Sequence, residues 1–93
     1  MIVGACMLEF HLPACRSLKQ KRMFLNRLKG RVSSRFNVAI AEVDHHDLWQ
    51  RSTVAVVSVS TEQAHLDALF EKVVREAERA GDGELLRYEV EYL

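Results

Sequence analysis

The chain has 93 residues, and its 13 lysines and arginines balance 13 aspartates and glutamates, so the formal net charge is zero. This length predicts one domain over residues 1–93, and a hydrophobic fraction of 48% excludes intrinsic disorder. No apolar run reaches the roughly 18 residues of a transmembrane helix, and the absence of a basic n-region argues against a signal peptide, so we expect a cytoplasmic protein without a membrane segment.

The first part of the chain predicts a strand followed by a helix. Residues 2–12 are apolar at nearly every position, which is typical of a strand buried on both faces. Ser17 then opens a helix, because Gln20 follows at the spacing of a capping box. The apolar stripe expected on this helix comprises Leu18, Phe24, Leu25, Leu28 and Val32.

Two more strands are expected in the middle of the chain. Residues 37–44 predict the second strand, and residues 52–60, rich in valine, predict the third. The polar connection between them contains Trp49, which we expect to pack over the edge of the core rather than stack on a ligand.

A second helix and a last strand complete the pattern. Ser60 and Gln63 repeat the capping-box spacing, and the two glycines Gly81 and Gly83 mark the end of the helix. Residues 84–93 alternate apolar and charged side chains, as a half-exposed strand does. The apolar stripe of this helix comprises Leu66, Leu69, Phe70, Val73, Val74 and Ala77.

This order predicts an α+β fold of the ferredoxin-like βαββαβ type, a four-stranded antiparallel sheet with two helices on one face. Right-handed crossovers place the first and third strands in the centre and the other two at the edges. The other sheet face should then expose aliphatic side chains, so we expect a homodimer or another protein on it. The residues predicted for this partner surface are Val3, Ala5, Met7, Val54 and Val56, or their neighbours one residue along.

Basic residues are concentrated in the first helix. Residues 16–35 contain eight basic side chains and no acidic one, whereas twelve acids and five bases follow from Phe36 onward. A basic helix on an acidic body favours partners rich in phosphate or carboxylate. The candidate phosphate- or nucleic-acid-binding residues are Arg16, Lys19, Lys21, Arg22, Arg27 and Arg51.

The beginning of the first helix offers two ways to balance these charges. Cations at a helix N-terminus oppose the helix dipole, by about 0.3–1 kcal/mol each. Because the first and second strands run in the same direction, the acidic cluster Glu42, Asp44 and Asp47 reaches this end and offers internal partners. Alternatively, Arg16 and Lys19 hold an external phosphate or carboxylate together with the helix amides. On a helical wheel Lys21 falls inside the apolar stripe, so we expect its stem to be partly buried.

No metal site, cofactor or catalytic residue is predicted. His45 and His46 adjoin the acidic cluster, but adjacent histidines on a strand are poor ligands for one ion, so a hydrogen-bonded polar turn is the favoured interpretation. Cys6 and Cys15 form no Cys-x-x-Cys pair and are expected to be plain thiols.

Three blocks, residues 17–22, 37–44 and 47–51, resemble the YlxP-like family of small bacterial proteins of unknown function. The resemblance implies a ferredoxin-like fold and a cytoplasmic bacterial protein. Members are often encoded beside genes for transcription termination, translation initiation and ribosome maturation, which implies work near RNA or ribosomes. No catalytic residues are established for the family. The matching motif residues are Ser17, Leu18, Lys19, Lys21, Arg22, Glu42, Asp44, Asp47, Leu48, Trp49 and Arg51.

Three functions compete at this level. The favoured one is a non-catalytic accessory module that binds RNA or ribosomal components through the basic helix, led by shape and charge because residues 54–60 contain no aromatic side chain. The second is a dimeric or structural subunit that uses the open sheet face. A remote third is an acylphosphatase-like hydrolase, for which Arg16 and Asn37 are present but the glycine-rich phosphate loop is not.

Overall fold

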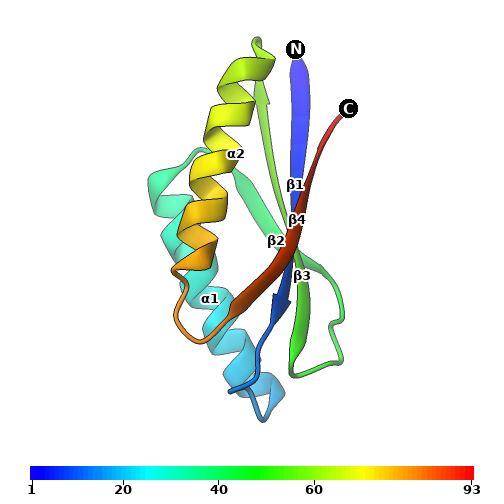
Figure 1. Cartoon of the computed structure of the whole chain (residues 1–93), viewed down its shortest axis with the longest axis vertical. Helices are drawn as coiled ribbons and strands as arrows, with labels where there is room; N and C mark the ends of the chain where they lie inside the picture. Colours follow the sequence, from blue (N-terminus) through cyan, green and yellow to red (C-terminus); the bar gives the residue numbers. More distant parts are fainter.

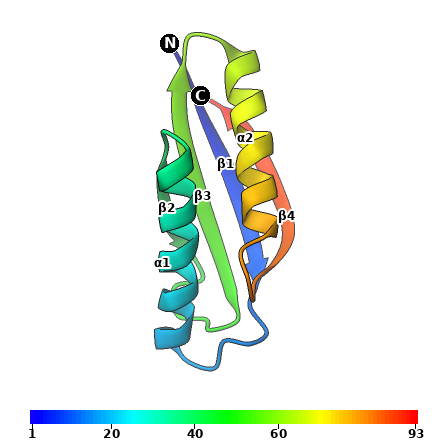
Figure 2. The same ribbon diagram turned by 90° about the vertical axis from the view of Figure 1, so that its left-hand side faces the viewer.

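The computed structural model describes residues 1–93 and has the predicted ferredoxin-like α+β architecture (Figure 1). The strands form one antiparallel sheet in the order β2-β3-β1-β4, and both helices cover the same face. Helix α1 lies over the β2 side and α2 over the β4 side (Figure 2). The elements are β1 Ile2–His11, α1 Leu18–Arg35, β2 Ala39–Asp44, β3 Arg51–Ser60, α2 Gln63–Glu78 and β4 Glu84–Tyr92. Neither helix has the length and apolar character that crossing a bilayer demands.

The register of the two central strands decides which side chains enter the core. Directly paired residues of antiparallel strands face the same side of a sheet. Residues Cys6 and Leu8 of β1 pair with Val56 and Val54 of β3, and all four are fully buried under the helices. Of the two sets predicted for the third strand, Val54 and Val56 therefore do not lie on the open face.

Their neighbours occupy the open face instead. Odd-numbered residues of β1 pair with odd-numbered residues of β3, so Val57 stands beside Ala5 and Ala55 stands beside Met7. These side chains are only partly buried. The open face of the sheet is therefore aliphatic, as predicted, but β3 contributes the alternate set of residues.

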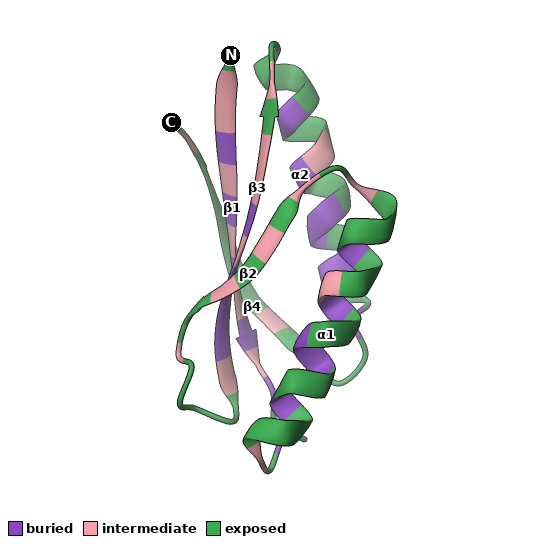
Figure 3. Ribbon diagram, turned by 180° about the vertical axis from the view of Figure 1, so that it is seen from behind, coloured by how far each residue is buried: buried purple, intermediate pink, exposed green.

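The core lies between the sheet and the inner stripes of the two helices, which Figure 3 shows as buried bands along α1 and α2. At its centre the rings of Phe10 and Phe24 meet edge to face, with centroids 5.4 Å apart, an arrangement that adds to the free energy of area burial. Leu18, predicted in the apolar stripe, is the first residue of α1 and is 41% exposed, and the buried residues of this helix begin at Lys21.

The two predicted capping boxes have different outcomes. At α1 the Ser17 hydroxyl accepts a hydrogen bond from the Gln20 amide at 3.1 Å, and the Gln20 side chain accepts one from the Arg16 amide at 2.5 Å. At α2 the prediction is wrong, because Ser60 still belongs to β3 and its hydroxyl accepts from the Glu62 amide at 3.1 Å. Two residues of turn separate this strand from its helix.

Both cysteines are free thiols buried in the core. Burial raises the pKa of the Cys6 thiol from 9.0 to about 11. Burial, followed by the nearby Asp82 carboxylate, also raises the pKa of Cys15. Since the thiolate is the reactive form, neither side chain is placed to act as a nucleophile or a redox sensor.

We expect Cys6 in the folded protein to resist alkylation by iodoacetamide at pH 7.5. A rise in pKa of two units lowers the thiolate fraction about a hundredfold, and burial blocks access as well. Mass spectrometry of timed samples, with and without urea, measures the rate at each cysteine. A rate for Cys6 in native buffer close to that in urea would contradict the assignment.

Candidate functional site

Lys21 lies inside the molecule and is the centre of a polar cluster. Its side chain is 2% exposed, and Nζ lies 2.7 Å from Glu42 Oε2. The same ammonium donates hydrogen bonds to the carbonyls of His45 at 2.5 Å and Leu48 at 2.7 Å. Three acceptors thus match the three donors of a lysine. Lys21 is therefore removed from the candidate phosphate-binding residues, and the internal alternative holds for this pair.

Glu42 is fixed from a second direction. Its Oε2 also accepts a hydrogen bond from the Ser52 hydroxyl at 2.7 Å, and its side chain is 12% exposed. The other two acids of the predicted cluster do not join it. Asp44 accepts from the amide of His45 at 2.7 Å, and Asp47 forms no ion pair. No group of three or more histidine, cysteine, aspartate or glutamate side chains is arranged to hold a metal ion.

Residues 45–50, here named the braced loop, are held from both ends. Lys21 fixes two of its carbonyls, and His45 adopts a left-handed φ of 63°. At the other end the side-chain amide of Gln50 donates from Nε2 to the backbone carbonyls of Pro13 and Cys15, each at 3.3 Å. The loop therefore presents its side chains from a fixed backbone.

The braced loop exposes its two large apolar side chains. Leu48 is 48% exposed and Trp49 is 51% exposed. They line a shallow depression of about 370 Å³ with Asp47, Gln50 and Arg51. The prediction that Trp49 packs over the edge of the core is therefore wrong. Sequence patterns mark an aromatic residue in a loop, but they do not tell which way the loop turns.

Two arginines of α1 form ion pairs with a glutamate of α2. Glu76 has a side chain only 7% exposed, and it lies 3.2 Å from both Arg31 Nε and Arg35 NH1. Arg31 also donates to the carbonyl of Arg79 at 3.1 Å. Charge counting along the sequence missed this link, because the partners are more than 40 residues apart. Arg27 has only a loose partner, Asp82, at 3.8 Å.

The remaining cations in α1 and just before it have no internal partner. Arg16, Lys19, Arg22 and Lys29 form no ion pair, and α1 contains no acidic residue. Spacings of three and four residues align side chains on one side of a helix. Those that align here, named the cationic stripe, are Lys19, Arg22, Asn26, Lys29 and Ser33. Since each residue turns the helix by about 100°, the stripe lies on the side opposite Arg31 and Arg35.

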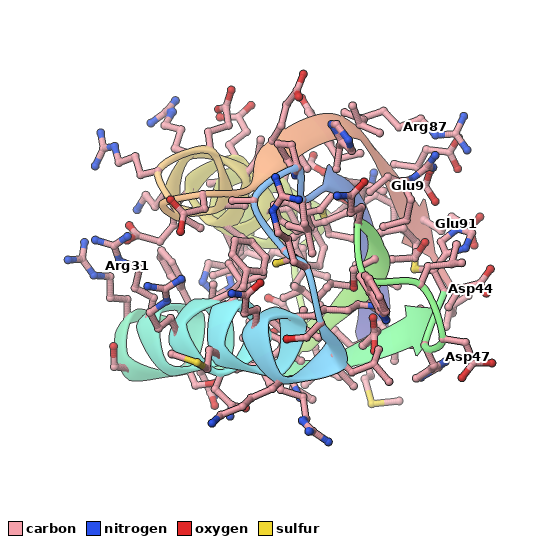
Figure 4. The ribbon with its side chains drawn as sticks, turned by 90° about the horizontal axis from the view of Figure 1, so that it is seen from below. Glu9, Arg31, Asp44, Asp47, Arg87 and Glu91 are labelled. Carbon is pink, nitrogen blue, oxygen red and sulfur yellow. The ribbon has the colours of Figure 1, made fainter.

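Arg51 belongs to a different surface. It begins β3 and faces the open side of the sheet, where its NH2 lies 3.4 Å from Glu9 Oε2. Glu9 also receives Arg87 at 3.6 Å and the Thr53 hydroxyl at 2.8 Å. Figure 4 shows Glu9 and Arg87 on the side of the molecule away from Arg31. Arg51 is therefore removed from the candidate phosphate-binding residues of the basic helix.

The acylphosphatase-like alternative fails on geometry. Arg16 precedes the first turn of α1, and Asn37 follows the last one. A helix of 18 residues separates them, which corresponds to about 27 Å at 1.5 Å per residue. The two side chains cannot hold the same phosphate.

Comparison with known proteins gives a family but no activity. The family described as "Protein of unknown function (DUF503)" matches residues 3–90. The chain is 36% identical over 58 residues to the uncharacterized protein YlxP of Bacillus subtilis (strain 168), covering 62% of this chain and 63% of that protein, less than two thirds of its length. Two solved structures share the fold alone. MupZ from Pseudomonas fluorescens is 17% identical with a TM-score of 0.59, and the match covers 95% of this chain and 69% of MupZ. The de novo designed protein Foldit4 is 14% identical with a TM-score of 0.57, and the match covers 100% of this chain and 97% of Foldit4. The chain therefore belongs to the DUF503 family of YlxP-like proteins, whose function is unknown.

Proposed function

We propose that this protein is a cytoplasmic, non-catalytic accessory module that binds RNA or ribosomal components through the cationic stripe of α1. One observation carries the proposal. Lys19, Arg22 and Lys29 share one side of a helix without acids, and none of them has an internal counter-charge. Arg16 lies just before the helix and adds positive charge at the end where the stripe begins, whereas Arg27 aligns with Arg31 and lies off the stripe.

The spacing of the stripe suits a phosphate backbone. At 1.5 Å per residue, Lys19 and Lys29 are about 15 Å apart along the helix axis, and Arg22 lies between them. Long side chains at such intervals can reach successive phosphates, while Asn26 and Ser33 supply further hydrogen-bond donors. Contacts of this kind position a nucleic acid without reading its sequence. The module should therefore discriminate weakly between sequences.

Charge reversal of the stripe tests this proposal. We expect Lys19→Glu with Arg22→Glu to lower the affinity for a 16-base-pair RNA duplex by tenfold or more, measured by fluorescence anisotropy. The matched control is Lys72→Glu with Arg75→Glu on α2, where both residues are exposed and without ion pairs. It changes the net charge by the same amount and should leave most of the affinity.

The salt dependence gives an independent measure. Three phosphate contacts predict a slope of about −2.7 in log K against log salt concentration. The stripe variant should flatten this slope, whereas the α2 control should keep it. Equal losses of RNA affinity in both variants would show that net charge alone causes the effect, and would reject the cationic stripe as the binding surface. A wild-type protein that retains no RNA at low salt would reject the function itself.

A further inference from the structure

The open face of the sheet is an apolar strip on the side away from both helices. The pairing of β1 with β3 and of β3 with β2 fixes its members, because directly paired residues share a face. Most are partly buried by one another, and Val59 is 57% exposed. The apolar residues of the open face are Val3, Ala5, Met7, Ala39, Ala41, Ala55, Val57 and Val59.

Acids without partners border this strip. Glu89 and Glu91 of β4 lie opposite Met7 and Ala5, and Asp44 of β2 lies opposite Thr53. Figure 4 shows Asp44, Asp47 and Glu91 on this same side of the molecule. None of these four acids forms an ion pair, whereas both arginines of the face, at positions 51 and 87, are already paired with Glu9. The two arginines share one carboxylate, and the acids of this face still outnumber its arginines, so the border is predominantly acidic.

The braced loop extends the same surface. Figure 1 shows the connection between β2 and β3 projecting on the side of the sheet that faces away from the helices. The ten-residue strands β1 and β3 are about 33 Å long and four strands span about 14 Å, so the sheet face covers at most roughly 460 Å², because β2 and β4 are shorter. A stable interface needs about 800 Å² per partner. The exposed Leu48 and Trp49 add apolar area beside the strip and a large aromatic anchor of the kind that dominates interfaces.

We infer that the open face and the braced loop form one docking surface for a basic, apolar segment of a partner protein. The partner presents aliphatic side chains to the strip and lysines or arginines to Asp44, Asp47, Glu89 and Glu91. Charge complementarity selects this occupant. A second copy would bring two predominantly acidic borders together, and the phosphates of RNA would meet the same repulsion.

The buried Lys21 gives this surface its rigidity. A lysine withdrawn from water is costly unless every donor is satisfied, and here two of its three partners are carbonyls of the braced loop. The ammonium of Lys21 therefore fixes the backbone of the braced loop, whose largest side chains are exposed. Holding Trp49 in place before binding removes an ordering cost from association.

Trp49 is the only tryptophan of the chain, so its fluorescence reports directly on this surface. The probe is a 14-residue amphipathic helical peptide of leucine and lysine, and its counterpart carries glutamate at every lysine position. We expect the lysine peptide to shift the emission of Trp49 to the blue and to slow its quenching by acrylamide. The glutamate peptide should do neither.

Variants of the full chain separate the contributions. Neutralising the border with Asp44→Asn, Asp47→Asn, Glu89→Gln and Glu91→Gln should weaken binding of the lysine peptide tenfold or more. The control, Glu71→Gln with Glu78→Gln at exposed and unpaired positions of α2, removes negative charge elsewhere and should bind as the unaltered protein does. Circular dichroism and thermal unfolding confirm that each variant is folded.

Three results would overturn the inference. Equal binding of both peptides would show an apolar surface without charge selection. Protection of Trp49 by a 12-nucleotide oligouridylate would assign the surface to RNA. A blue shift that grows with protein concentration alone would assign it to a second copy.

Discussion

Replacing Lys21 by methionine will lower the free energy of unfolding by about 3–5 kcal/mol, because it leaves a buried carboxylate without its counter-charge. Methionine fills a similar volume, so the loss reports the ammonium rather than a cavity. Glu42 would keep only the Ser52 hydroxyl, the carbonyl of Leu48 would lose its donor, and the carbonyl of His45 would keep only the Leu48 amide. Urea unfolding followed by circular dichroism measures the change.

Two further variants make this result specific. Lys19→Met removes an exposed cation from the same helix turn and should change stability by less than about 0.5 kcal/mol. The double change Lys21→Met with Glu42→Leu removes both charges and should recover part of the loss, since a buried pair contributes less than either uncompensated charge costs. Similar losses for Lys21→Met and Lys19→Met would show that the buried pair does not matter.

The same substitution, glycine to alanine, should have opposite effects at two positions. At Gly83 a new Cβ would collide with the ring of Phe24 and approach Leu12 to 3.2 Å. Phe24 is 2% exposed and packs on Phe10, so it cannot move aside freely. Overpacking of this kind costs about 1–3 kcal/mol, which we expect as the loss of stability in Gly83→Ala.

Gly30→Ala provides the contrast. Nothing lies within 4 Å of the Cβ that would be added there, and Gly30 sits inside a helix, where alanine is favoured by about 1 kcal/mol. This variant should therefore be more stable than the unaltered protein by about 0.5–1 kcal/mol. Thermal unfolding of both variants decides the question, and destabilisation at both positions would contradict the packing described here.

The fold was predictable because its signals are local and mutually consistent. The apolar run of β1, the Ser17 cap and the alternation of β4 each indicate one element, and the handedness of crossovers then leaves one sheet order. What escaped prediction is register. A shift of one residue exchanges the two faces of a strand, and nothing local to Val54 or Val56 says which of two apolar faces meets the helices.

The candidate site was less predictable, because side chains distant in sequence decide it. The helical wheel placed Lys21 toward the core and the topology brought Glu42 near it, and both features appear in the structure. Yet Glu76 forms ion pairs with Arg31 and Arg35, which lie 40 or more residues away in the sequence. Similarly, Glu9 of β1 forms an ion pair with Arg51 of the neighbouring strand β3. Tertiary packing therefore decides which cations remain without an ion pair. The cationic stripe can be defined only once these ion pairs are known.

The separation of the free cations of α1 from the acids bordering the open face gives the molecule a consequence that its zero net charge conceals. A neutral body whose free cations and free acids lie on separate surfaces carries an electric dipole moment. Such a body turns as it approaches a charged surface, so that encounters occur in one preferred orientation. Added salt should slow these oriented encounters even though the protein as a whole bears no charge.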